Sequence, residues 1–228
     1  MEEFARYAVY YAPPAGDFAD RAAAWLGRDA LTGAVVAQPR FDGVDDLGGL
    51  TREPRRYGFH GTLKPPFRLA SGYSAGELHL AIGLLARRLP ALQMAGLDLS
   101  RLGRFLALTP RGDDAALSDL AACLVRDLDM FRAPLTEAEI ARRRPDSLSP
   151  RQRALLEDWG YPHVMEEFRF HLTLSDRLQD ADIPAIEAAA RAWFAPEQAA
   201  PFDLSEICLF GEAADGTFVL LHRYALSG

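Results

Sequence analysis

Polar and apolar residues alternate along two short segments of this chain, at Tyr57–Lys64 and at Glu167–Ser175. Successive side chains of a β-strand point to opposite faces, so alternation of this kind predicts a strand with one buried face. In the first segment His60, Thr62 and Lys64 would share the polar face. We therefore expect a strand that is ended by the following Pro-Pro pair and presents these three side chains away from the core.

The second segment repeats the pattern. Arg169, His171, Thr173 and Ser175 would share its polar face, with phenylalanine and leucine residues on the other. Both segments contain His-x-Thr-Leu directly after a phenylalanine, which gives each predicted strand a histidine and a threonine at the same spacing. One such motif arises often by chance, and a histidine on a strand is more often structural than catalytic. Two copies in equivalent contexts are a much stronger signal.

Further helices and strands are predicted around these segments. Apolar residues at helical spacing, with polar or acidic caps, predict helices over residues 17–26, 74–88, 117–128 and 182–194. Short apolar runs predict strands over residues 7–12, 92–99, 103–109, 201–210 and 217–224. Residues 31–53 predict a loop with at most one short strand or helical turn. Residues 133–160 open with a capping-box pattern and predict an inserted helical hairpin.

The order of the predicted elements repeats. After each histidine motif come a helix, a strand, a turn and a second strand, which indicates an internal duplication. We expect an α+β, duplicated bilobal fold in which two antiparallel sheets face a central cleft and helices cover the outer faces. Residues 1–228 would form a single bilobal domain, with the helical insertion at about 133–160. The cleft would bring two histidines and two threonines together.

Composition narrows the class of protein. The 228 residues are 49% hydrophobic and 25% charged, as is ordinary for a soluble globular protein. The N-terminus lacks the pattern of a secretory signal, and no apolar run is long enough to span a membrane, so we expect a cytoplasmic protein without a membrane partner. A net charge of −7 disfavours long nucleic acid as a partner. The two cysteines form no Cys-x-x-Cys pair, which excludes a zinc ribbon or a dithiol redox centre.

The candidate chemistry is acid–base catalysis on an anion. His60 and His171 could divide the two proton transfers, because a histidine changes charge near neutral pH. The hydroxyls of Thr62 and Thr173 could bind the non-bridging oxygens of a phosphate held between them. This chemistry requires neither a metal ion nor a cofactor, and we expect none.

Three further residues are candidates for binding the substrate. Lys64 shares the face of His60 and could neutralise charge that develops on phosphorus. Arg169 has the same strand parity as His171 and could contact the substrate phosphate. Tyr10, on the first predicted strand, could face the cleft and stack on a base or a sugar.

The paired motifs resemble those of the two-histidine phosphoesterases, a superfamily that includes cyclic nucleotide phosphodiesterases and the RNA 2′,3′-cyclic phosphodiesterases once described as RNA ligases. Several other stretches resemble the bacterial branch found with phosphonate-degradation operons: residues 6–10, 24–29, 54–60, 64–69 and 159–162. The resemblance extends over essentially the whole chain. It implies a duplicated bilobal α+β fold and metal-independent opening of a cyclic phosphodiester by His60, Thr62, His171 and Thr173.

The substrate is the open question at this level. Phosphonate breakdown yields a ribosyl 1,2-cyclic phosphate, which is the substrate that we prefer. A 2′,3′-cyclic phosphate at an RNA end is one alternative, and a non-catalytic module that binds a nucleotide or sugar phosphate is another. The sequence leaves open which histidine is the acid, the oligomeric state and the role of the 133–160 insertion.

Overall fold

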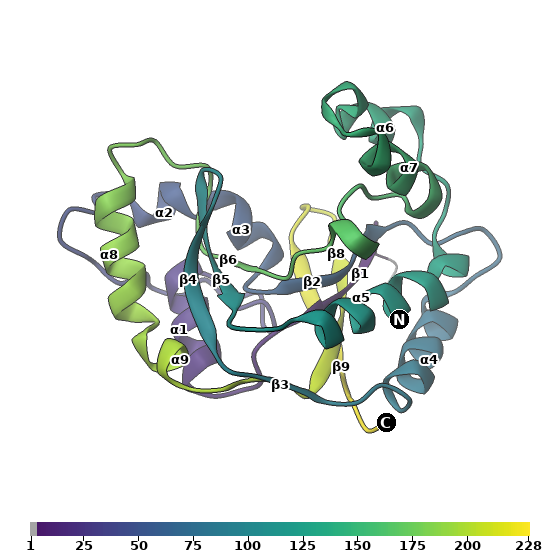
Figure 1. The fold of residues 1–228 in the computed structure, drawn as a ribbon, viewed down its shortest axis with the longest axis horizontal. Coiled ribbons are helices and arrows are strands. Elements are labelled where there is room, and N and C mark those ends of the chain that lie inside the picture. Colours follow the sequence, from purple (N-terminus) through teal and green to yellow (C-terminus); the bar gives the residue numbers. More distant parts are fainter. Residues whose placement is uncertain (1–3) are drawn as a thin grey trace.

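The computed structural model describes residues 4–228, which form a mixed α+β structure (Figure 1). The strands are β1 (Tyr7–Tyr11), β2 (Gly61–Phe67), β3 (Leu92–Met94), β4 (Leu97–Leu102), β5 (Phe105–Pro110), β6 (Leu172–Thr173), β7 (Phe202–Leu204), β8 (Glu206–Glu212) and β9 (Phe218–Ala225). The α-helices are α1 (Asp17–Leu26), α2 (Leu47–Leu50), α3 (Arg52–Tyr57), α4 (Ala75–Ala86), α5 (Ala115–Asp127), α6 (Glu137–Arg142), α7 (Pro150–Trp159), α8 (Ile183–Trp193) and α9 (Ala195–Ala199). Short 3₁₀ turns lie at Asp129–Phe131, Pro145–Ser147 and Met165–Glu167.

The expected α+β class with antiparallel strands is confirmed. Seven strands form one antiparallel sheet in the order β4-β5-β6-β2-β1-β8-β9, and β3 pairs with β7 in a separate two-stranded sheet. The strands that we expected as two facing sheets are joined at one point, where Gly61 of β2 pairs with Leu172 of β6. Hydrogen bonding therefore continues from one half of the duplication into the other.

The duplicated order of elements is confirmed, and the hairpin of each half joins the sheet beside a strand of the other half. The β4–β5 hairpin follows β2 in the sequence but pairs with β6, through Ala107↔Thr173 and Leu108↔Leu172. The β8–β9 hairpin follows β6 in the sequence but lies beside β1, which in turn pairs with β2. This exchange leaves β2 and β6 as neighbours at the centre of the sheet, where the two motifs meet.

The strands predicted over 92–99 and 201–210 are each divided in two. The chain turns at Gly96, whose φ of 152° favours glycine, between β3 and β4, and it turns at Ser205 between β7 and β8. The outer pieces, β3 and β7, pair with each other through Leu92↔Leu204 and Met94↔Phe202. The division is the same in both halves, as duplication requires, and it frees β4 and β8 to join the large sheet.

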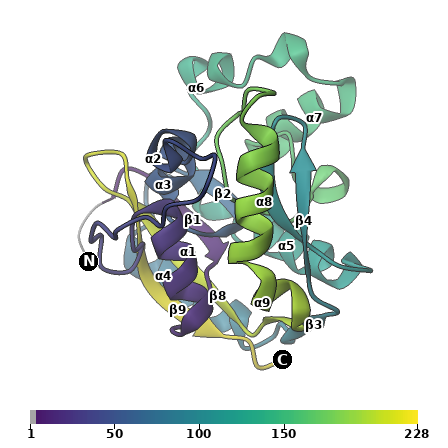
Figure 2. The same cartoon turned by 90° about the vertical axis from the view of Figure 1, so that its left-hand side faces the viewer.

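Helices flank the sheet on its outer sides. α1 and α8 lie side by side (Figures 1 and 2), and the indole of Trp193 donates a hydrogen bond to the carbonyl of Arg21. α4 packs on β9 and α5 packs on β2. Trp25 is fully buried, and its indole N–H donates to the carbonyl of Leu174 at 2.8 Å, which ties α1 to the segment after the second motif.

Several helix boundaries follow the predicted capping signals. Ser74, Thr136 and Ser149 each form a capping box at the start of α4, α6 and α7. Gly27 ends α1 in the left-handed conformation, with φ of 79°. Helices α6 and α7 fall within residues 133–160 and lie apart from the other helices, at the upper right of Figure 1. No helix among the described residues is long and apolar enough to cross a membrane.

The motif segments differ from their predicted form. The strand expected over Tyr57–Lys64 begins only at Gly61 and continues through both prolines to Phe67, because its pairing with β1 is irregular there and does not need their missing N–H groups. The strand expected over Glu167–Ser175 is reduced to Leu172–Thr173. Residues 31–53, expected as a loop with at most a short element, contain the helical turn α2 and the start of α3.

Candidate active site

The pairing of β2 with β6 brings the two motifs together. Gly61 and Leu172, the middle residues of the two His-x-Thr sequences, are antiparallel partners. Continuing that register by one residue in each direction sets His60 opposite Thr173 and Thr62 opposite His171. Because side chains alternate along a strand, these four side chains share the face opposite to Gly61 and Leu172. Residues 111 positions apart thus form one cluster, as the sequence predicted.

Both imidazole rings are oriented by the same backbone contact. Nδ1 of His60 lies 2.8 Å from the carbonyl oxygen of Gly58, and Nδ1 of His171 lies 2.8 Å from that of Arg169. A carbonyl oxygen only accepts, so the proton of each neutral ring resides on Nδ1. Nε2 of each ring then carries a lone pair and is the atom left for proton transfer.

Aromatic residues surround His60. The ring of Tyr10 lies 4.1 Å from it, centroid to centroid, and the ring of Tyr57 lies 5.7 Å away. Burial lowers the pKa of His60 to about 4, the hydrogen bond to Gly58 opposes this shift, and the nearby His171 adds to it. His60 is therefore neutral at pH 7, and the contribution of His171 reflects how close the two rings are.

His171 has less aromatic cover. Its ring lies 5.7 Å from the ring of Phe105, at the start of β5. Burial lowers the pKa of His171, the hydrogen bond to the Arg169 carbonyl opposes this shift, and the neighbouring His163 adds to it. This ring too is neutral near pH 7.

A cleft of about 660 Å³ opens over the motif cluster. His60, Thr62 and Thr173 line it directly. His171 is not among the lining residues, but the neighbouring Phe105 is. This volume lies within the range of small-molecule sites in proteins.

The cleft also contains residues that were not among the predicted site residues. Arg6 approaches from the segment before β1, and Arg143 and Tyr161 approach from the region of the helical insertion. The guanidinium of Arg143 lies 4.5 Å from the centroid of the Tyr161 ring. Arg6 and Tyr161 lay within stretches that resemble the phosphonate branch, so a signal for them was present. Arg143 belongs to a run of arginines over residues 142–153, which could bind a phosphate if it folds over the cleft, but no local pattern shows that it does so.

The three further candidates for substrate binding lie in different places. Tyr10 lines the cleft, but it is only 1% exposed and packs between His60 and Phe210, so it supports the histidine ring rather than offering an open surface. Lys64 does not line the cleft, because the strand carries its side chain into an adjacent pocket. Arg169 is exposed and lines neither pocket; its carbonyl oxygen, rather than its side chain, contacts His171.

The chemistry of the site resides in few groups. Ser175, which shares the strand parity of His171, is buried. Its hydroxyl accepts a hydrogen bond from the Leu106 N–H and donates one to the Asp176 carbonyl.

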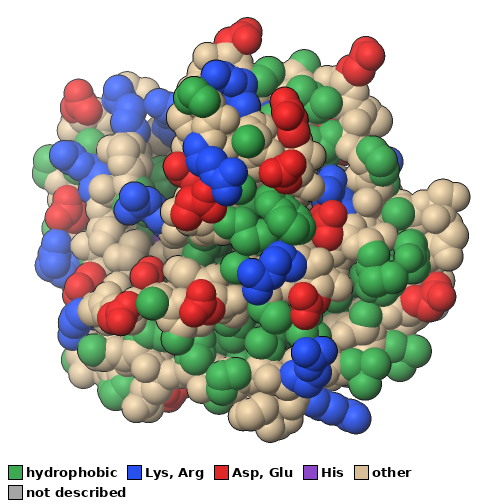
Figure 3. All heavy atoms as spheres, turned by 45° about the vertical axis from the view of Figure 1, so that its right-hand side comes forward, with side chains coloured by type: hydrophobic (Ala, Val, Ile, Leu, Met, Phe, Trp, Pro, Cys, Tyr) green, Lys and Arg blue, Asp and Glu red, His purple; other side chains and the backbone are tan. Residues whose placement is uncertain are grey.

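Among residues 4–228 there is no group of three or more His, Cys, Asp or Glu side chains placed to hold a metal ion. Basic and acidic side chains are mixed over the face in Figure 3, so the local charge of a pocket matters more than any field of the whole surface.

Comparison with known families identifies the group to which the chain is related. Residues 62–219 match the model described as "Protein of unknown function (DUF1045)". The chain belongs to this DUF1045 family. The matched range begins at Thr62 and includes His171 and Thr173, so it covers most of the site described above.

Two curated relatives of this DUF1045 protein have the name "Ribose 1,5-bisphosphate phosphokinase PhnN". The protein from Janthinobacterium sp. (strain Marseille) is 37% identical over 100% of this chain and 52% of its own length. The protein from Laribacter hongkongensis (strain HLHK9) is 39% identical over 83% of this chain and 44% of its own length. The chain thus spans about half the length of the curated relatives it matches.

Among solved structures, the DUF1045 protein resembles LigT of E. coli. The complex of LigT with 3′-AMP has a TM-score of 0.48 at 17% identity, with 99% of this chain and 100% of that chain covered. The complex with NADP+ has a TM-score of 0.45 at 18% identity over the same shares. Likeness at this level does not assign an activity.

Proposed function

We propose that this DUF1045 protein is a phosphodiesterase that opens a small cyclic phosphate without a metal ion, with His60 and His171 as the general acid–base pair. The β2–β6 pairing carries the proposal, because it sets both motif histidines and both threonines on one face beside a cleft. The equal contacts of the two Nδ1 atoms support it, since they leave both Nε2 atoms available for proton transfer.

The protonation states fit such a reaction. In the free protein burial lowers the pKa of both histidines, so each ring begins as an acceptor. A phosphate anion bound between the rings raises the pKa of both, and one of them takes up a proton. One ring then removes a proton from water as the water oxygen bonds to phosphorus. The protonated ring delivers its proton to the ester oxygen as its bond to phosphorus breaks, which leaves a phosphate monoester and a free hydroxyl.

The hydroxyls of Thr62 and Thr173 suit the phosphate itself. Each can donate a hydrogen bond to a non-bridging oxygen, and such bonds strengthen as charge grows on those oxygens. Arg143 adds positive charge at the same cleft, where Arg6 is paired with Glu212. The two hydroxyls would hold the phosphorus between the two imidazoles.

Ribosyl 1,2-cyclic phosphate is the substrate that we prefer. The cleft volume of about 660 Å³ suits a sugar phosphate, and the name of the relatives refers to a ribose bisphosphate. We do not propose their kinase activity for this chain. Its only lysine, Lys64, is followed by proline, so it contains no Gly-x₄-Gly-Lys-Ser/Thr loop of the kind that holds nucleotide phosphates.

A ³¹P NMR assay in the presence of EDTA tests the proposal. Ribosyl 1,2-cyclic phosphate should be converted to a monoester, and His60→Ala or His171→Ala should each reduce the rate by about 10²–10⁴-fold. Faster turnover of an RNA oligonucleotide with a 2′,3′-cyclic end would instead make RNA the substrate. Stabilisation by cyclic phosphates without any product would indicate a binding module. Full activity in either histidine variant would reject the mechanism.

A further inference from the structure

A second pocket, of about 220 Å³, lies directly beside the cleft. The two share five lining residues, among them Arg6, Pro65, Pro66 and Arg143. We call it the basic pocket, because seven of its lining side chains are Arg or Lys and a single one, Glu139, is acidic. Because the two share these residues, a ligand bound in the cleft could extend into the basic pocket.

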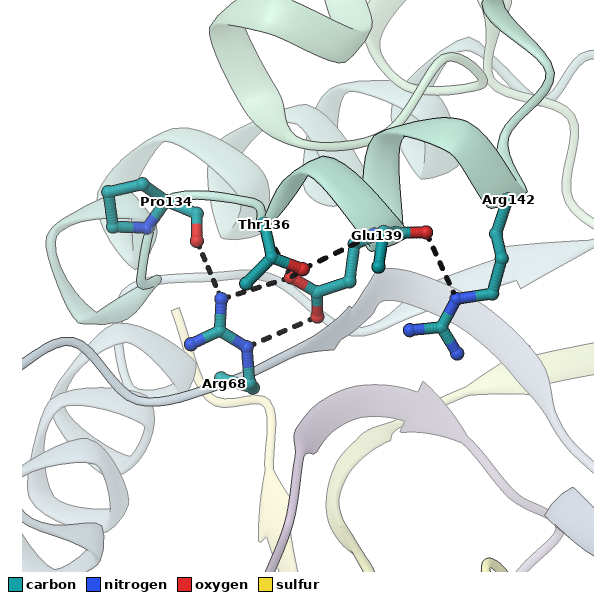
Figure 4. A network of polar contacts seen from close by, with 6 residues as sticks. Arg68, Pro134, Thr136, Glu139 and Arg142 are labelled. Carbon is teal, nitrogen blue, oxygen red and sulfur yellow. Dashed lines mark hydrogen bonds and ion pairs between the residues drawn. The ribbon is translucent and has the colours of Figure 1, made fainter.

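Some of this positive charge is neutralised by carboxylates. Arg68 pairs with Glu139 at 3.0 Å and also donates to the carbonyl of Pro134, which fixes the start of α6 against the end of β2 (Figure 4). Asp129 pairs with Arg132 at 2.7 Å. Arg6 and Arg56 likewise pair with acidic residues. These contacts explain how so many cations can lie together in a chain with a net charge of −7.

Two arginines of the insertion lack a carboxylate partner among the described residues. Among residues 4–228, neither Arg142 nor Arg143 has a carboxylate oxygen within 4.0 Å. The Nε of Arg142 donates to the carbonyl of Ala138, one turn earlier in α6 (Figure 4), and the guanidinium of Arg143 lies over Tyr161. Both side chains therefore bring an uncompensated positive charge to the rim of the pocket. An anion is the natural partner for such a pair.

Lys64 lies at the floor of the basic pocket, and it is the only lysine of the chain. It is 2% exposed, and its ammonium donates one hydrogen bond, to the carbonyl of Val125 at 3.1 Å. Asp129 lies at 3.9 Å, too far for a hydrogen bond. An ammonium has three N–H donors, so Lys64 has the capacity to bind an anion that enters the pocket.

The pKa of Lys64 should respond to an anion in the pocket. Burial and the nearby Arg132 lower its pKa to about 8, against the opposing effect of Asp129. The pocket cations Arg68, Arg142 and Arg143 surround the same space, where Glu139 is the lining carboxylate. A bound anion would replace the solvation that burial removes and would favour the charged ammonium.

We propose that the basic pocket binds a second phosphate group of the substrate, so that the substrate carries a cyclic phosphodiester at one end and a phosphate monoester at the other. The monoester would bind Lys64, Arg142 and Arg143, while the cyclic phosphate lies between the histidines. This proposal rests on the proposed function, and it gives the 133–160 insertion a role: α6 and the residue that follows it bring Arg142 and Arg143 to the substrate.

Turnover of two matched substrates tests this inference. Ribosyl 1,2-cyclic phosphate with a 5-phosphate should have a kcat/KM about 10–100-fold above that of the same sugar without it, the value of one or two charge-assisted hydrogen bonds. Arg142→Gln removes one charged donor to the monoester and should reduce this ratio about 10-fold. Arg142 is exposed, so its replacement should leave the fold intact. Arg101→Gln, the same change at an exposed position on β4, should leave the ratio as it is.

A second measurement examines the pocket without any catalysis. In protein labelled with ¹³C-lysine, the side chain of Lys64 gives a signal that no other lysine overlaps. Inorganic phosphate should raise the pKa of Lys64, and Arg142→Gln should weaken that effect. If phosphate shifts Lys64 while no cyclic phosphate is hydrolysed, the proposed function fails and the anion site remains. If phosphate leaves Lys64 unchanged, or the two substrates react equally well, the second-phosphate site is wrong.

Discussion

His60 and His171 are held in the same way and surrounded differently. Each Nδ1 lies 2.8 Å from the carbonyl oxygen two residues earlier, a contact made within the motif segment itself. The surroundings come in part from distant strands: Tyr10 of β1 lies against His60, beside the local Tyr57, and Phe105 of β5 lies against His171. Local sequence thus fixes the orientation and tautomer of each ring, whereas the fold around it sets how readily the ring accepts a proton.

The two motif strands also differ in their middle residue. His60 is followed by Gly61 and the seven-residue β2, while His171 is followed by Leu172 and the two-residue β6. A Cβ on Gly61 would lie 2.3 Å from the Phe170 ring and 3.1 Å from Leu172. The side chains of one motif therefore fill the space that the glycine of the other leaves empty, and this is how the two strands approach closely enough to pair.

The largest expected effect tests whether both histidines belong to one reaction. His60→Ala and His171→Ala should each lower kcat by about 10²–10⁴-fold, and the double variant should fall little further, because the two proton transfers occur in one step. ³¹P NMR of cyclic phosphate turnover measures this. His222→Ala, at an exposed position on β9, is the control and should retain its rate. Multiplication of the two losses in the double variant would mean that the rings act independently.

The contact between the motif strands should appear in the free energy of unfolding. Leu172→Ala removes a fully buried side chain and should cost about 2–5 kcal/mol. Gly61→Ala should cost about 1–3 kcal/mol, because its methyl group meets the Phe170 ring. Urea denaturation measures both. Phe170→Leu shortens the obstructing side chain, so the pair Gly61→Ala, Phe170→Leu should lose less than the sum of the single changes, and strict additivity would count against this packing.

The threonines should have smaller and similar effects on turnover. Thr62→Val and Thr173→Val each remove one hydroxyl near an anion, which should lower kcat/KM about 10–100-fold. Thr62→Ser and Thr173→Ser keep the hydroxyl and should restore most of the rate. Steady-state kinetics with the four variants measures this. A serine variant as slow as its valine counterpart would show that the methyl group, and not the hydroxyl, is what matters.

The last prediction concerns pH and separates the two histidines. The pKa of His60 is about 4 in the folded protein and about 6.5 in an unfolded chain, so between these values the unfolded state binds more protons. Stability should therefore fall as pH decreases from about 6.5 to about 4. Tyr10→Ala exposes His60 and should raise its pKa towards 6.5, as NMR titration can measure, while the pKa of His171 changes little. An equal change in the pKa of both histidines would contradict the claim that each ring's own surroundings set its pKa.

The sequence predicted the central features of this site because they depend on local periodicity. The alternation around His60 and His171 indicated the shared face, and the repeated order of elements indicated the duplication. The exchange of hairpins between the halves depends on contacts between distant strands, which no local pattern records. The same holds for Lys64: its strand parity suggested the cleft, but irregular pairing between β1 and β2 accompanies the turn of its side chain into the basic pocket. Arg143 reaches the cleft only because the insertion folds back over it.

The central claim is that the two imidazoles meet around one phosphate, and NMR titration of the histidine side chains with inorganic phosphate tests it most directly. We expect phosphate to raise the pKa of both His60 and His171 and to shift the Nε2 signals of both at the same dissociation constant. His79, whose Nδ1 lies 2.7 Å from the hydroxyl of Tyr224, should not respond. A response by only one of the two motif histidines, or two responses with different dissociation constants, would contradict the claim.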